Sequence, residues 1–105
     1  MAVQPIMDLR GASGAIYRFR LAQPDALPNA AGNFVCLVAA QDGDRVVTCG
    51  ATTSLATAAA AWKAAARDGA THLFIRLNVA RQVRTVEHDD LVSALSPARV
   101  ISDPG

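Results

Sequence analysis

Apolar and polar positions divide the chain into short segments typical of strands and helices. Residues 15–21, AIYRFRL, alternate in polarity as a half-buried strand does. Two strongly apolar runs follow at residues 33–40 (NFVCLVAA) and 45–50 (RVVTCG). The QDGD between them indicates a β-hairpin, because Asp-Gly favours a tight turn. Residues 71–77, THLFIRL, predict a further strand whose leucines and isoleucine share one face.

The segment between the hairpin and the strand at 71–77 predicts a helix at residues 55–68 that consists mainly of alanine. Thr53 or Ser54 is expected to cap its first turn, and Gly69 to take the left-handed conformation after its last turn. A helix that is apolar on nearly every side is usually covered on more than one side. A protein partner or a second copy of the chain would supply that cover at Trp62 and Ala58; otherwise the alanines simply face solvent.

A second helix is predicted at residues 81–95, RQVRTVEHDDLVSAL, and a Ser-Pro pair ends it. At about 100° per residue, Glu87 lies in an apolar arc between Val83 and Leu91. A carboxylate there must be paired, hydrogen-bonded or placed at a cleft. His88 lies on a neighbouring arc that also holds Arg84.

These elements predict a single α+β domain over residues 1–105. Its sheet is expected to be small, three-stranded and mainly antiparallel, with two flanking helices and room for one extra N-terminal strand at 15–21. Residues 1–14 and 102–105 show little pattern and are expected to be poorly ordered.

The register of the hairpin has two alternatives. A two-residue turn at Asp42-Gly43 places Cys36 opposite Cys49, whereas a three-residue loop with Gly43 in a left-handed bulge position places Cys36 opposite Thr48. In either register the two thiols are expected to be small buried hydrophobic groups rather than a redox pair.

Composition and charge exclude several classes of protein. Half of the residues are apolar and 18% are charged, as in a folded protein, and the net charge of +1 does not indicate a nucleic-acid or membrane partner. No stretch approaches the ~20 apolar residues that a membrane-spanning helix needs, and the first residues lack the features of a signal peptide. Two cysteines are too few for a disulfide framework, so a cytoplasmic location with reduced thiols is expected.

Candidate chemistry is confined to the region around the second helix. Arg76, Arg81 and Arg84 form a basic cluster at a strand-to-helix junction, which could hold a phosphate together with the free N–H groups of the helix. The same arginines could instead pair with the acidic run at 87–90. Neighbouring residues on a helix diverge, so that run does not predict a metal site, and no cofactor-binding motif is found.

Three stretches together resemble the GIY-YIG endonuclease family: GNFVCLV (32–38), VVTCGATTSL (46–55) and RTVEHDDLVSALSP (84–97). In that family a Gly-Ile-Tyr strand pairs with a Tyr-Ile-Gly strand that leads into a helix with an arginine, and a later helix carries a metal-binding glutamate. The resemblance covers residues 32–100 and rests on framework positions.

The resemblance implies that the chemical groups of the family have been replaced. Phe34 and Thr48 stand where the two tyrosines would be, and the helix arginine falls on Thr57 or its neighbour Ala58. The metal-binding glutamate falls on His88 when counted without gaps, with Glu87 one place away. Because both tyrosines serve one site, the resemblance also implies the register that pairs Cys36 with Thr48.

The expected function is therefore a catalytically inactive GIY-YIG-like domain that binds a protein partner or itself, without a cofactor. The first alternative is a weak nucleic-acid binder that uses Arg76, Arg81 and Arg84. The second is a divergent metal-dependent nuclease that uses Glu87 or His88, with Tyr17 supplied by the N-terminal strand.

Overall fold

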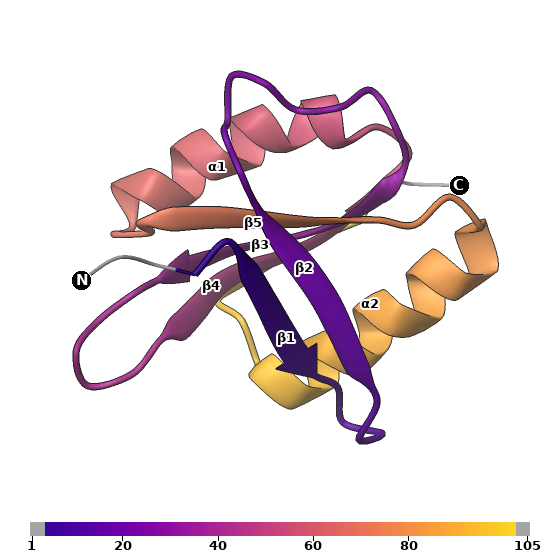
Figure 1. The fold of residues 1–105 in the computed structure, drawn as a ribbon, viewed down its shortest axis with the longest axis horizontal. Coiled ribbons are helices and arrows are strands. Elements are labelled where there is room, and N and C mark those ends of the chain that lie inside the picture. Colours follow the sequence, from indigo (N-terminus) through magenta and orange to yellow (C-terminus); the bar gives the residue numbers. More distant parts are fainter. Residues whose placement is uncertain (1–3, 103–105) are drawn as a thin grey trace.

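One six-stranded sheet forms the centre of the computed structural model, which describes residues 4–102 (Figure 1). Its strands occur in the order β1-β2-β5-β3-β4-β6, and every neighbouring pair is antiparallel except β4 and β6, which are parallel. The elements are β1 (Ile6–Arg10), β2 (Ile16–Ala22), β3 (Gly32–Val38), β4 (Arg45–Thr52), the 3₁₀ turn η1 (Leu55–Thr57), α1 (Ala58–Arg67), β5 (His72–Leu77), α2 (Arg81–Leu95) and β6 (Arg99–Ser102).

The predicted three-stranded, mainly antiparallel sheet is therefore wrong, because the sheet has six strands and is mixed. The three expected strands form its β5-β3-β4 part, and the segment at 15–21 is β2. Ile6–Arg10 lie within the stretch 1–14 that was expected to be poorly ordered, yet they form β1; residues 1–3 and 103–105 of the stretches with that expectation lie outside the described residues. β1 and β6, which were not predicted as strands, occupy the two edges of the sheet. Their residues are exposed or half-buried, so neither carries the strongly apolar pattern that marks the central strands.

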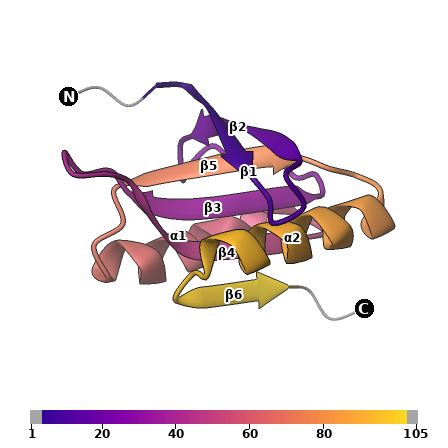
Figure 2. The same cartoon turned by 90° about the horizontal axis from the view of Figure 1, so that it is seen from below.

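The two helices cover opposite faces of the sheet (Figure 1). Leu55 and Ala58 pack with Phe34 on the α1 face, whereas Leu91 packs with Phe74 on the α2 face. Figure 2 shows β6 at one edge of the sheet near α2, and β1 and β2 at the other edge. Neither helix among residues 4–102 is long and apolar enough to cross a membrane.

The β3–β4 hairpin pairs Cys36 with Thr48, which confirms the second of the two predicted registers. The cause differs from the predicted one: residues 39–44 connect the strands, and a bulge follows, because Leu37 pairs with Val46. Gly43 has the predicted positive φ, at 127°. The thiols of Cys36 and Cys49 are free and lie on opposite faces of the sheet.

The helix predicted at 55–68 is divided into η1 and α1. Ser54 takes the predicted N-cap position, at the start of η1, but its side chain makes no capping bond: its hydroxyl donates to Asn29 Oδ1, and its N–H donates to Thr52 Oγ1. Gly69 has a φ of 97°, as expected for the residue that follows a helix.

Helix α2 has the predicted bounds and buries one face against the sheet. Arg84, His88 and Leu91 are its buried residues, whereas Val83 is 48% exposed and Val86 is 65% exposed. Of the predicted apolar arc, Val83 is thus exposed and Leu91 is buried, and Glu87 between them is ion-paired with Arg76, as expected of a carboxylate at that position. A helix that exposes valines and buries an arginine and a histidine departs from the usual distribution, which directs attention to what these two side chains face.

Candidate functional site

The five positions singled out by the family resemblance lie on both sides of the sheet. Phe34 belongs to the apolar core on the α1 face and is 1% exposed, and Thr48, also 1% exposed, pairs with Cys36 of the same face. The Thr57 hydroxyl donates to the carbonyl of Ser54 at the start of α1. Glu87 and His88 belong to α2, which covers the opposite face. The sheet thus separates the first three positions from the last two.

The predicted contact residues of α1 differ in accessibility. Ala58 is fully buried against the sheet, so it offers no surface to a partner. Trp62 is half-buried and packs against the edge of the same core. The predicted alanine-rich contact surface is therefore reduced to Trp62 and to exposed alanines elsewhere on α1.

A polar network joins α2 to the centre of the sheet. Glu87 Oε1 accepts from Arg76 Nε at 2.9 Å and from Asn78 Nδ2 at 2.8 Å. Asn78 Nδ2 also donates to Asn33 Oδ1 at 2.9 Å, and Asn33 Nδ2 donates to the carbonyl oxygen of Arg84 at 3.2 Å. The side chain of Glu87 is 14% exposed and Asn33 is 1% exposed, so these groups rely on one another in place of water. We refer to Asn33, Arg76, Asn78, Arg84 and Glu87 as the α2 network.

A second polar contact fixes the β1–β2 hairpin to α2. The Tyr17 hydroxyl donates to Asp90 Oδ2 at 2.7 Å, and the Ser13 hydroxyl donates to the same oxygen at 2.6 Å. These hydrogen bonds lower the pKa of Asp90, and the bond to the Asp90 carboxylate, assisted by burial, raises the pKa of Tyr17. The hydroxyl of Tyr17 is therefore held in its protonated form by a structural partner, which makes it a poor base.

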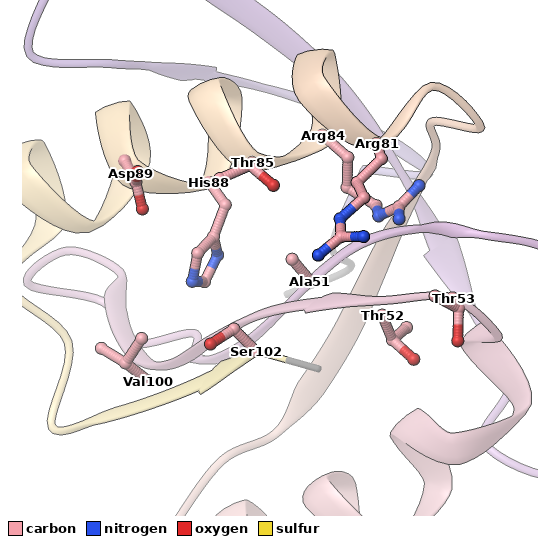
Figure 3. Close-up of a pocket in the computed structure, with 10 residues that line it drawn as sticks. All are labelled: Ala51, Thr52, Thr53, Arg81, Arg84, Thr85, His88, Asp89, Val100 and Ser102. Atoms are coloured by element: carbon pink, nitrogen blue, oxygen red, sulfur yellow. The ribbon is translucent and has the colours of Figure 1, made fainter. Parts of the chain in front are cut away.

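A cleft of about 300 Å³ lies between α2 and the β4–β6 part of the sheet (Figure 3). We call it the α2 cleft. Its lining is mostly polar and comes from three elements and the loop after β4: Ala51, Thr52, Thr53, Arg81, Arg84, Thr85, His88, Asp89, Val100 and Ser102. Two arginines from the first turn of α2 lie at one end of the cleft, and Asp89 lies at the other (Figure 3).

The arginine end of the α2 cleft carries positive charge without an acidic partner among residues 4–102. Arg84 is 6% exposed, and its Nη1 donates to the carbonyls of Asn78 at 3.1 Å and Val79 at 2.9 Å. A guanidinium has five N–H donors, so Nε and Nη2 of Arg84 keep donors that those carbonyls do not use. Arg81 is exposed. In the described residues neither arginine makes an ion pair.

The start of α2 adds to this positive potential. Ala80 at its N-cap has no side chain that could accept a hydrogen bond, and its first turn contains no acidic residue. The N-terminal end of a helix carries partial positive charge, and proteins usually place an acid or a capping oxygen there. Here the first turn bears Arg81 and Arg84 instead. This arrangement favours an anion at the arginine end of the cleft.

His88 points from the middle of α2 into the same cleft (Figure 3). It is 5% exposed, and its ring nitrogens make no hydrogen bond with any residue in the described part of the chain. Burial lowers the pKa of His88, and the charge of Asp89 opposes that effect. Among residues 4–102, Thr48 Oγ1 is the single side-chain polar atom that is both fully buried and without a partner. The nitrogens of His88 also lack a partner, so they are not fully buried, and a molecule in the cleft can reach them.

The predicted arginine cluster is divided by the structure. Arg76 pairs with Glu87 in the α2 network, whereas Arg81 and Arg84 line the cleft. No group of three or more potential metal-ligating side chains gathers within residues 4–102. Sequence reasoning missed Thr52, Thr53, Thr85 and Ser102, because single hydroxyl residues carry no pattern that marks them as neighbours.

Comparisons with protein-family models, with characterised proteins and with solved structures find no match to this chain. The resemblance to GIY-YIG endonucleases therefore stays a prediction, and the α2 cleft has to be interpreted from its own geometry.

Proposed function

We propose that the chain is a binding module without catalytic activity and that the α2 cleft is its ligand site, with an oxyanion as the ligand. The observation that carries this proposal is the arginine end of the cleft. Two guanidinium groups and an uncapped helix start meet there without a carboxylate from residues 4–102. Desolvating an arginine such as Arg84 with carbonyl partners alone is costly, and an anion would offset that cost.

The absence of catalysis is supported by where potential proton-transfer groups lie. Thr48 and Thr57 are separated by the sheet from Glu87 and His88, so the replaced family positions do not converge. Glu87 is held by Arg76 and Asn78 within the α2 network. A general acid or base has to reach a substrate, and these hydrogen bonds use the Glu87 carboxylate for structure instead.

The alternative binding surface is the alanine-rich helix α1, which would contact a protein partner or a second copy of the chain. We favour the cleft because Ala58 is buried and Trp62 is half-covered by its own core, whereas the cleft presents charged groups from several elements. Light scattering tests the competing interpretation: a mass that stays at that of one chain over the accessible concentration range removes self-assembly.

The test of the proposal is a titration of ¹⁵N-labelled protein with inorganic phosphate and inorganic sulfate at constant ionic strength, with chloride as the reference anion. Amide resonances of Thr52, Thr53, Thr85 and the first turn of α2 should shift and saturate with phosphate and sulfate. Arg81→Gln should weaken binding about tenfold, because a charge-assisted hydrogen bond to an anion is lost.

Arg45→Gln is the matched control, because Arg45 is an exposed arginine at the far end of β4 from the cleft. It should leave the affinity unchanged. Chloride shifts equal to those of phosphate, or equal losses in both variants, would reject the cleft as an anion site. Mixed-sequence oligonucleotides form a further arm: tight binding that weakens steeply with salt would assign the site to a nucleic-acid backbone.

A further inference from the structure

His88 lies in the α2 cleft beside the two arginines. It is 5% exposed, lies one helical turn after Arg84, and points into the cleft with no hydrogen-bond partner from residues 4–102 (Figure 3). A buried imidazole normally has a partner for at least one nitrogen. The ring nitrogens of His88 are therefore available to a molecule that enters the cleft.

Resting on the proposed function, we propose that His88 is a specificity-determining residue that takes up one proton when the ligand binds, and that the ligand is a doubly charged oxyanion such as a phosphate monoester. Two arginines without an acidic partner among residues 4–102 favour a dianion over a singly charged ligand. The second negative charge stabilises an imidazolium at His88, whose N–H groups then donate to the oxyanion.

The surroundings of His88 support a change of protonation on binding. Among residues 4–102, the charged groups that line the cleft around His88 are Arg81, Arg84 and Asp89, all from α2. The other elements contribute side chains that do not titrate in this range: Ala51, Thr52 and Thr53 from β4 and the loop after it, and Val100 and Ser102 from β6. In the free protein burial keeps the ring neutral near pH 7, because its pKa lies below the ordinary value. An adjacent dianion acts in the opposite direction and raises that pKa.

The sign of the pH dependence follows from this difference. The bound state holds one more proton than the free state between the two pKa values of His88, so lower pH favours binding. The affinity should rise as pH falls, by at most about tenfold per pH unit, which is the limit for one linked proton.

Sulfate is the appropriate probe because it stays a dianion over the range in which histidine titrates. Its dissociation constant should be at least about fivefold lower at pH ~6 than at pH ~8 for the unmodified protein. His88→Asn, which keeps a hydrogen-bonding side chain that does not titrate, should bind sulfate with an affinity independent of pH.

His72→Asn is the matched control, because His72 is the second histidine of the chain and its Nδ1 contacts Thr71 Oγ1 away from the cleft. It should keep the full pH dependence. If His88→Asn fails to fold, the ring protons of His88 in the unmodified protein give the answer: sulfate should raise the pKa of His88. An unchanged pKa of His88 with sulfate bound, or a pH dependence that survives in a folded His88→Asn, would overturn the inference.

The ligand class is tested with methyl phosphate, a monoester, and dimethyl phosphate, a diester with a single charge. The monoester should bind at least about tenfold more tightly at pH ~7, because it adds one charge in a partly desolvated cleft. Oligonucleotides with and without a terminal phosphate extend the test, and the terminal phosphate should be required. Equal binding of the two esters overturns the ligand class but leaves the anion site intact, whereas no binding of any oxyanion rejects the proposed function itself.

Discussion

Replacing Glu87 by alanine removes the acceptor at the centre of the α2 network. Glu87 Oε1 receives charge-assisted hydrogen bonds from Arg76 at 2.9 Å and from Asn78 at 2.8 Å. Each such bond contributes about 1.5–3 kcal/mol. The side chain of Arg76 is 29% exposed and can be hydrated when Glu87 is removed, so the net loss is smaller than the sum of the two hydrogen-bond contributions. The expected loss in the free energy of unfolding is about 2–3 kcal/mol, and the melting temperature should fall by roughly 10–20 °C.

Urea denaturation followed by circular dichroism and by the fluorescence of Trp62, the single tryptophan, measures this loss. Asp89→Ala is the control, because Asp89 is the exposed carboxylate two positions further along α2 and should change stability by less than about 0.5 kcal/mol. Arg76→Met and the double variant complete a cycle in which Arg76 and Glu87 should couple by more than about 1 kcal/mol. A Glu87→Ala loss below about 1 kcal/mol would show that the network does not stabilise the fold.

Three further outcomes are expected. Gly50→Ala should lower the free energy of unfolding by about 1–3 kcal/mol, because the new β-carbon would meet the ring of Phe34 on the paired strand. In urea denaturation, the double variant with Phe34→Leu should lose less stability than the sum of the two single losses. Burial raises the pKa of Cys36 and of Cys49 to about 12, so both thiols should react with DTNB at pH ~8 only as the protein unfolds; rapid reaction of the native protein would contradict their burial. Asp90 has a lowered pKa, so its contribution to stability is present at neutral pH and is lost as pH falls below about 4. The melting temperature of Asp90→Asn, measured as a function of pH, should therefore fall less steeply below pH ~4 than that of the unmodified protein.

The sequence was sufficient to predict the centre of the fold. The apolar runs at 33–40, 45–50 and 71–77 appear as β3, β4 and β5, and α2 has the predicted bounds. The strands are apolar runs bounded by turn residues, a pattern that can be recognised from local sequence alone. The edge strands β1 and β6 give a weaker signal, because they are short and none of their residues is fully buried.

The candidate site was less predictable, since its main feature depends on contacts far apart in the sequence. The sequence pattern placed Glu87 in an apolar arc with Val83 and Leu91, and His88 on a neighbouring arc with Arg84, without indicating which arc faces the sheet. The structure buries Arg84 and His88, because carbonyls of the preceding loop receive the guanidinium and β4 and β6 complete the cleft around the imidazole. The contacts that surround Arg84 and His88 exist only in the folded chain, so local sequence patterns could not identify these residues as buried.

Strand β5 lies between two β-hairpins, each of which pairs residues that are close in the sequence. The β1–β2 and β3–β4 pairs each close over a short loop, yet β2 and β3 meet only through β5, which pairs with both. Closing long loops is entropically expensive before the resulting contacts can repay it. We therefore expect the pairing of β5 with β2 and β3 to be a late and slow step in folding. Until that step, the N–H and C=O groups on one side of β2 and of β3 are unpaired and can bind a strand of another chain.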